Sequence, residues 1–148
     1  MTGSALTALS VEPYILLTTF RASGAPVSTP VWVAGGLGGL LVTTSGASGK
    51  VKRIRRNSSV ELTACDRTGT VSERATIVRA TGFVVDDPES RQIIEEALER
   101  KYGDRYRAVR AARRRPLSES VVIRILPGDE GTPAPSQQRD LRENESSE

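Results

Sequence analysis

The chain has 148 residues, of which 37% are hydrophobic and 26% are charged, so it is long enough to bury the core of one globular domain. It contains no histidine and a single cysteine, which excludes Ser-His-Asp and Cys-His catalytic sites, histidine-based zinc sites and an internal disulfide. The formal net charge of +3 leaves the body of the chain basic, because the acidic residues gather after residue 86 and in the last twenty or so residues.

The N-terminal segment MTGSALTALS lacks the basic start and sustained apolar run of a signal peptide. No apolar run reaches the ~20 residues that a membrane span requires. A lone cysteine suits a reducing compartment. We therefore expect a cytoplasmic protein that does not associate with membranes.

The first two strands are predicted as a β-hairpin. Residues 14–19 (YILLTT) and 27–33 (VSTPVWV) are rich in β-forming residues, and the polar segment RASGAP between them contains Gly24, which can adopt a positive φ. Pro30 has no backbone N–H to donate, so its strand must lie at a sheet edge, contain a bulge or face a ligand at that position.

The middle of the chain predicts a turn, a strand, a short helix and another strand. The glycine-rich segment 34–39 reads as the turn, and 40–44 (LLVTT) as the strand. Residues 50–56 predict the helix, with its cations outward. The alternating segment 60–65 predicts a half-buried strand that ends at Cys65, which we interpret as a core thiol rather than a reactive one.

The C-terminal half predicts one long strand over 75–85, or two halves joined by a bulge at Gly82. The sequence DDP at 86–88 begins an amphipathic helix that Gly103 ends. A strongly cationic second helix is predicted over 104–115, and SVVIRIL at 120–126 predicts a final strand.

These elements amount to six or seven strands and two or three helices. Because the strands are not joined by regular βαβ units, they favour an antiparallel sheet or barrel in an α+β domain that is mainly β. The domain is predicted to span 1–126. Residues 127–148 contain one leucine and no other sizeable apolar side chain, so they are predicted to be a disordered tail.

The segment 43–57 (TTSGASGKVKRIRRN) allows three interpretations of its charge. Its cations could form a solvated helix face. Its Gly/Ser corner, next to a helix N-terminus that begins with Lys50, could instead bind a phosphate. A nucleic-acid surface is disfavoured, because no aromatic side chain interleaves the cations and no nucleic-acid-binding motif is present.

The order YILLTTFRASGAPVSTPVWV, then LLVTTSGASGKVKRIRRNSSVELTACDRTG, then ATGFVV resembles the pyridoxamine 5′-phosphate oxidase-like split-barrel family. The likeness spans about residues 13–126 and is greatest to the actinobacterial branch that uses the deazaflavin coenzyme F420. It implies a six-stranded antiparallel split β-barrel of the FMN-binding type with flanking helices. It also implies a homodimer whose cofactor groove lies at the subunit interface.

The resemblance also implies roles for residues on two segments. The hairpin strand Val27–Trp32 would run along the cofactor ring. Thr43 and Thr44 would contact the ring edge or ribityl chain, and Lys50 would match the family's phosphate-binding lysine. The implied cofactor-binding residues are Ser28, Thr29, Pro30, Val31, Trp32, Thr43, Thr44, Ser48, Gly49, Lys50, Lys52 and Arg53. No catalytic side chain and no metal ligand is assigned.

The sequence departs from the vitamin B6 oxidases of this family. They usually have arginine where this chain has Gly49, and their C-terminal histidine pattern is absent. The cations of 50–56, together with Arg110–Arg115, suit the long anionic tail of F420, and FMN is the alternative cofactor. The expected activity is hydride transfer between reduced F420 and an unsaturated small molecule; the alternatives are FMN-dependent oxidoreduction and non-catalytic binding of F420, a flavin or a tetrapyrrole.

Overall fold

The structure, a computed structural model, describes residues 2–113 and 119–128. Seven strands and four helices are formed within these ranges. In chain order they are α1 (Thr2–Ser10), β1 (Ile15–Phe20), β2 (Pro26–Val31), β3 (Ala34–Gly36), β4 (Gly39–Ser45), α2 (Gly49–Arg56), β5 (Ser59–Ala64), β6 (Val78–Val85), α3 (Pro88–Tyr102), α4 (Asp104–Ala112) and β7 (Ser120–Pro127).

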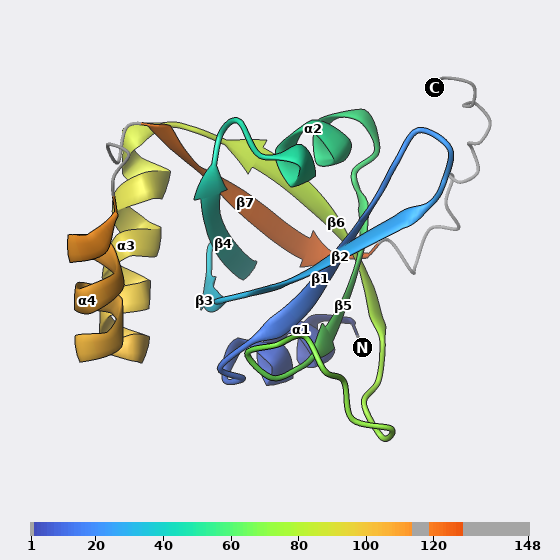
Figure 1. The fold of residues 1–148 in the computed structure, drawn as a ribbon, viewed down its shortest axis with the longest axis horizontal. Helices are drawn as coiled ribbons and strands as arrows, with labels where there is room; N and C mark the ends of the chain where they lie inside the picture. Colours follow the sequence, from blue (N-terminus) through green and yellow to red (C-terminus); the bar gives the residue numbers. More distant parts are fainter. Residues whose placement is uncertain (1, 114–118, 129–148) are drawn as a thin grey trace.

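All strand pairs are antiparallel, in the order β2-β1-β5-β6-β7-β4-β3, and the sheet curls into a half-open barrel (Figure 1). The predicted α+β split barrel is therefore confirmed, with seven strands in place of six. The additional strand is β3, which the sequence predicted as part of a turn. Its residues pair with the start of β4, from Ala34 opposite Leu41 to Gly36 opposite Gly39.

The barrel is split between β2 and β4. Strand β2 is an edge strand of the described sheet, and Pro30 lies opposite Leu16 on the neighbouring β1, so the proline occupies an edge, one of the three positions that the sequence allowed. Strand β3 covers the free side of β4 only as far as Leu41, and no other described strand pairs with β4 on that side. The second half of β4, residues 42–45, thus presents an open edge.

The two faces of the curled sheet bury separate apolar clusters. Inside the barrel, β-strand side chains such as Leu17 and Ile123 pack with Leu6 and Leu9 of α1. Outside it, α3 and α4 pack against the sheet, where Leu98 and Tyr106 are buried (Figure 1). Helix α1 was not predicted, although its leucines at i and i+3 show the spacing of a helix face.

Helix α2 lies over β1 and β6 and buries Val51 and Ile54, so the predicted helix is present and its apolar side chains face the sheet. Strand β6 is one continuous strand without a bulge. Gly82 keeps regular register opposite Ile125, and a Cβ at this position would come within 3.6 Å of Ile54. The tighter contact of such a Cβ would be with the Val60 side chain of β5, at 3.3 Å, so the glycine leaves room for Val60 in the core. The strand starts at Val78, three residues later than the predicted start.

The start and end of α3 agree with the sequence signals. The Asp87 side chain accepts a hydrogen bond from the backbone N–H of Ser90, and the chain turns at Gly103 with a φ of 59°. Helix α4 was predicted to reach residue 115 but ends at Ala112, because the backbone of Arg113 is extended; residues 114–115 lie outside the described residues. Strand β7 includes Pro127, one residue beyond the predicted domain boundary, and the remainder of the predicted tail, from residue 129, lies outside the described residues.

Two consecutive residues at the end of α3 connect the helix to distant backbone. The Lys101 ammonium donates hydrogen bonds to the carbonyl oxygens of Ser10, Glu12 and Val33, at 2.6–2.7 Å. Burial lowers the pKa of Lys101 to about 8, whereas the nearby Glu12 carboxylate acts in the opposite direction. The Tyr102 hydroxyl donates to the carbonyl oxygen of Pro13 at 2.7 Å.

Cys65 follows β5 and is half-buried rather than fully buried. Burial and the neighbouring Asp66 carboxylate raise the pKa of its thiol, which favours the unreactive protonated form. None of the helices in the described part of the chain is long and apolar enough to cross a membrane.

Candidate functional site

Three polar side chains meet where β4 ends and α2 begins. The Lys50 ammonium lies 3.4 Å from the Thr44 hydroxyl, which lies 3.4 Å from the Ser48 hydroxyl. Ser48 is the N-cap residue of α2, but its side chain makes no capping hydrogen bond. The N–H groups of the first helical turn thus remain available to an anion. We call Thr44, Ser48, Gly49, Lys50 and Arg53 the anion corner.

Arg53 folds back over the start of its own helix. Its Nε donates a hydrogen bond to the Thr19 hydroxyl of β1 at 2.7 Å. A Cβ at Gly49 would lie only 2.7 Å from Nη1 of Arg53, so glycine leaves space for the guanidinium to lie against the helix N-terminus. An arginine at position 49, as in the vitamin B6 oxidases, would occupy this space.

The charges of the anion corner are not balanced by carboxylates. In the described chain, no side chain of α2 forms an ion pair, and its first turn contains no acidic residue. Burial and the neighbouring Arg53 lower the pKa of Lys50. Burial, Arg21 and Arg56 lower the pKa of Arg53. A bound anion would relieve this repulsion among the cations.

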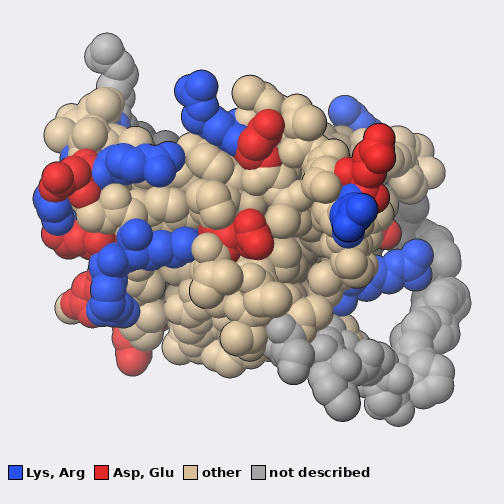
Figure 2. Space-filling model, turned by 90° about the horizontal axis from the view of Figure 1, so that it is seen from below, with Lys and Arg blue, Asp and Glu red and all other residues tan. Residues whose placement is uncertain are grey.

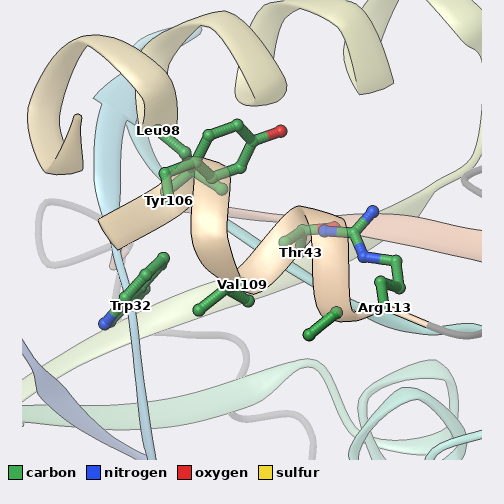
Figure 3. A pocket seen from close by; sticks show the side chains of 7 residues that line it. Trp32, Thr43, Leu98, Tyr106, Val109 and Arg113 are labelled. Carbon is green, nitrogen blue, oxygen red and sulfur yellow. The ribbon is translucent and has the colours of Figure 1, made fainter. Parts of the chain in front are cut away.

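A second site lies on the opposite face of β4. An apolar cavity of about 400 Å³ lies between the sheet, α3 and α4 (Figure 3). The residues that line it are Trp32, Thr43, Leu98, Tyr106, Val109, Ala112 and Arg113. Trp32 is held in place by stacking on Tyr102, with ring centroids 4.2 Å apart, so one wall of the cavity is a fixed aromatic ring.

The two predicted threonines of β4 face different sites. Because side chains alternate along a strand, Thr43 points into the cavity whereas Thr44 points to the anion corner. The sequence prediction placed both threonines against one ligand and did not use this alternation.

The predicted β2 residues are also divided between two faces. Thr29 and Val31 lie opposite Leu17 and Ile15, on the core face of the sheet. Ser28 lies on the other face, where its hydroxyl is 2.7 Å from that of Thr18. Pro30 shares this face and would lie 3.7 Å from a Cβ at Gly69.

The structure therefore brings the predicted set together in two groups and separates the rest. Thr44, Ser48, Gly49, Lys50 and Arg53 form the anion corner, and Trp32 and Thr43 line the cavity. Lys52 is exposed on α2 and makes no described contact with the corner.

The cations of α4 are partly compensated, unlike those of α2. Arg107 forms ion pairs with Asp104 and Glu99, and Arg113 lies 3.8 Å from Glu95. Viewed from below, the end of the molecule that carries α3 and α4 shows acidic and basic side chains side by side (Figure 2). The expectation that Arg110–Arg115 acts as an additional anion site is thus weaker than that for α2, and residues 114–115 lie outside the described residues.

Sequence reasoning missed several residues of these sites. Thr19 orients Arg53 from a strand more than thirty residues earlier, and Leu98 and Val109 reach the cavity from two helices. The signal for Thr19 in the sequence was the pair of consecutive threonines, Thr18 and Thr19, near the end of β1. Within the described residues, no group of three or more histidine, cysteine, aspartate or glutamate side chains could hold a metal ion.

Comparison with known proteins gives both sequence and structural matches. Residues 1–129 match the family model described as pyridoxamine 5′-phosphate oxidase. No curated protein sequence matches the chain significantly.

Among solved structures, an F420 reductase is 23% identical, with a TM-score of 0.58 over 81% of this chain and 90% of its own. The heme storage protein HutZ from Vibrio cholerae is 18% identical, with a TM-score of 0.57 over 78% of this chain and 82% of its own. The conserved protein Rv2991 from Mycobacterium tuberculosis is 17% identical, with a TM-score of 0.64 over 84% of this chain and 78% of its own. At these identities the structural matches establish the fold.

Proposed function

Since the chain belongs to the pyridoxamine 5′-phosphate oxidase family, we propose that it is an F420-dependent oxidoreductase. In this proposal the protein transfers a hydride between reduced F420 and an unsaturated small-molecule acceptor. The observation that carries the proposal is the convergence of Lys50 and Arg53 on the N-terminus of α2 without a carboxylate partner among the described residues.

The residues of the anion corner fit a phosphate group. Lys50 supplies a charge and Ser48 a hydroxyl, while the first N–H groups of α2 point in the direction that favours an anion. Gly49 supports the same assignment, because it keeps the Arg53 guanidinium at the helix N-terminus. Both F420 and FMN carry a phosphate, so the corner by itself suits either cofactor.

Two observations favour F420 over FMN. The cations continue beyond the phosphate position, because Lys52, Arg55 and Arg56 follow on α2 without carboxylate partners in the described chain. F420 extends beyond its phosphate into a glutamate tail, for which such a row of cations is complementary. In addition, one of the structures with this fold is an F420 reductase.

The chain's own residues bind and orient the cofactor. When bound, a deazaflavin supplies hydride transfer, and the protein supplies position and electrostatic environment. Lys50, Arg53 and Ser48 hold the phosphate, and Thr44 fixes Lys50 through the 3.4 Å contact. The open edge of β4 at residues 42–44 offers unpaired backbone groups to the polar edge of the ring. We assign no proton donor.

We further propose that the protein is a homodimer whose cofactor groove lies between the subunits. The support is the family resemblance and the exposure of large apolar side chains on the isolated chain, among them Ile77 at 62% and Phe83 at 45%. Sedimentation velocity of the purified protein, at concentrations spanning the cofactor Kd, tests this. A monomer throughout this range contradicts the dimer.

The cofactor can be identified directly. Purified protein should retain F420 in preference to FMN, heme or biliverdin, as measured by absorbance and mass spectrometry of the released ligand. Preference for FMN would contradict the F420 assignment while supporting the phosphate site. Retention of heme would contradict both the F420 assignment and the phosphate site. It would also require an axial ligand other than histidine, because the chain contains no histidine.

Turnover distinguishes an enzyme from a carrier. Reduced F420 bound to the protein should be reoxidised by at least one member of a panel of enones, quinones and biliverdin, faster than without protein. Stoichiometric binding without acceptor-dependent reoxidation across the panel would support the non-catalytic alternative, in which the protein stores or carries the cofactor.

A further inference from the structure

We propose that Lys101 is a positioning residue for Trp32, and that the charge of its ammonium group determines how firmly the indole is held at the cofactor position. The contacts that Lys101 makes within the protein carry the first part of this inference. The consequence for ligand binding rests on the proposed function, in which Trp32 contacts the ring of F420.

The connection between β2 and β3 takes its hydrogen bonds from α3 instead of from the sheet. Trp32 and Val33 lie between these strands and pair with no strand in the described part of the chain. Val33 is fully buried, so its backbone groups need partners within the protein. Its carbonyl oxygen accepts a hydrogen bond from the Lys101 ammonium at 2.6 Å, and its N–H donates one to the Tyr102 hydroxyl at 3.2 Å.

The Lys101 ammonium acts on the indole by two routes. One is the carbonyl of Val33, the residue that follows Trp32 in the chain. The other is the Tyr102 ring, whose centre lies 5.0 Å from the Lys101 nitrogen and which stacks on Trp32.

Both routes depend on the charged form of the amine. The ammonium has three N–H groups, and each donates to one carbonyl oxygen, on Ser10, Glu12 and Val33. The neutral amine has two N–H groups and no charge. Deprotonation therefore leaves one of these three carbonyl oxygens without its donor and removes the cation–π attraction to Tyr102.

The Glu12 carboxylate acts on the charge of Lys101 within the described chain. Neither α1 nor β3 contains a charged residue, and Glu12, which follows α1, favours the ammonium form. Tyr14 and Arg105 act on Tyr102, and their side chains approach each other at 3.5 Å. Burial lowers the pKa of Lys101 to about 8, so its charge changes just above neutral pH.

The expected loosening of Trp32 is local and is not a step in unfolding. Between about pH 8 and the ordinary pKa of 10.5, the unfolded chain binds more protons at Lys101 than the folded chain does. The contribution of this group to the free energy of unfolding therefore rises with pH over that range. A more accessible Trp32 at alkaline pH would thus not reflect a less stable fold.

Quenching of Trp32 emission by acrylamide measures this accessibility in the protein without ligand. The sequence contains no other tryptophan, and acrylamide is neutral, so the quenching constant reports exposure of the indole. The constant should increase with pH, with its midpoint near the pKa of Lys101, in a titration from about pH 6 to 9.5, below the range in which tyrosines ionise. A constant that does not change with pH would overturn the proposal.

Two variants and a matched control assign the transition. Lys101→Met should give a high quenching constant at every pH. Glu12→Gln removes the carboxylate that favours the ammonium, so the midpoint should move to lower pH. Glu96→Gln removes an equal charge at an exposed position of α3 and should leave the midpoint unchanged. An unchanged midpoint in Glu12→Gln would overturn the proposal even if Lys101→Met fails to fold.

Ligand binding separates this inference from the proposed function. In Glu12→Gln, the fall of F420 affinity with pH should begin at lower pH than in the unmodified protein. Binding of a phosphate monoester, which reports on Lys50, should keep its pH dependence. An F420 affinity with the same pH dependence in both proteins would refute the link to the cofactor position.

The two proposals can fail independently. If the Trp32 transition is present and F420 does not bind, the positioning role of Lys101 stands and the oxidoreductase proposal fails. If F420 is bound and turned over while the quenching constant does not change with pH, the oxidoreductase proposal stands and the positioning role is refuted.

Discussion

The indole ring of Trp32 lies parallel to the phenol ring of Tyr102, with 4.2 Å between their centroids and 8° between their planes. The stack joins the connection between β2 and β3 to the end of α3, seventy residues later in the chain. The Tyr102 hydroxyl strengthens the same junction, because it accepts a hydrogen bond from the Val33 N–H at 3.2 Å and donates one to Pro13. Tyr102 thus fixes the end of α3 against the split of the barrel, together with the three hydrogen bonds of Lys101.

Tyr102→Phe should lower the free energy of unfolding by about 1–3 kcal/mol, because it retains the stack but leaves buried backbone groups without their partner. Urea unfolding followed by circular dichroism measures the change. Tyr106→Phe is the matched control, since its hydroxyl has no partner, and it should leave stability unchanged or raise it. Equal losses in the two variants would show that the hydrogen bonds of the Tyr102 hydroxyl contribute nothing specific to stability.

Lys50→Ala should weaken binding of F420 by about 1.5–3 kcal/mol, through loss of one charge-assisted contact with the phosphate. Isothermal titration calorimetry measures the affinity. Arg100→Ala removes an equal charge from an exposed position of α3, outside the anion corner and the row of cations on α2, and should have a much smaller effect. Unchanged affinity for both F420 and FMN in Lys50→Ala would place the phosphate elsewhere.

Phosphate binding should weaken as the pH rises through the alkaline range. The pKa of Lys50 in the free protein lies below its ordinary 10.5 through burial and Arg53, and a bound anion favours the ammonium form and raises this pKa. At a pH where Lys50 of the free protein is partly neutral, phosphate binding is therefore accompanied by uptake of a proton. The affinity for phosphate falls as the pH increases through the pKa of Lys50. A phosphate monoester with a second pKa of about 6 is a suitable probe, because its own charge is constant in this range.

Calorimetry in two buffers of different ionisation enthalpy measures this proton uptake. The uptake should disappear in Lys50→Ala, whose affinity should be lower and nearly independent of pH over the same range. Persistence of the uptake in this variant would assign the titration to another group.

Gly49→Ala should weaken phosphate binding with little loss of stability. The new methyl group would meet the mobile end of the Arg53 side chain, which can move away at low cost, but the guanidinium would then leave the helix N-terminus. In an Arg53→Ala background the same substitution should have no further effect on affinity. A double-mutant cycle measures this coupling, and additive losses would contradict the assigned role of Gly49.

Removal of residues 129–148 should leave both the unfolding free energy and the F420 affinity unchanged. The described fold is complete at β7, which pairs with β4 and β6 along its length, and the removed segment has too little apolar surface to add a core. Thermal unfolding and calorimetry of the truncated chain test this. A loss of affinity alone would assign the tail a role at the cofactor site.

Local signals were sufficient for much of the fold. The hairpin of β1 and β2 follows from β-forming runs around Gly24, and the start of α3 follows from Asp87 and Pro88. Strand β3 could not be found in this way, because Gly35 and Gly36 carry no strand preference and pair only once β4 is present.

The candidate site was predictable only where it lies within one segment. Ser48, Gly49 and Lys50 are adjacent in sequence, so the corner was visible as a pattern. The contact between Arg53 and Thr19 joins residues 34 positions apart, and the cavity requires α3 and α4 to pack against Trp32. Such contacts depend on tertiary packing, which the spacing of residue types along the chain does not specify.

The alternation of Thr43 and Thr44 along β4 has a practical consequence for protein engineering. Thr43 lines the apolar cavity and the adjacent Thr44 belongs to the anion corner, so consecutive residues serve two sites on opposite faces of the strand. Libraries randomised at position 43 alone should alter which organic molecules the protein accepts, and libraries at position 44 alone should alter which phosphorylated ones it retains. The two selectivities can thus be optimised in separate rounds and then combined in a single gene.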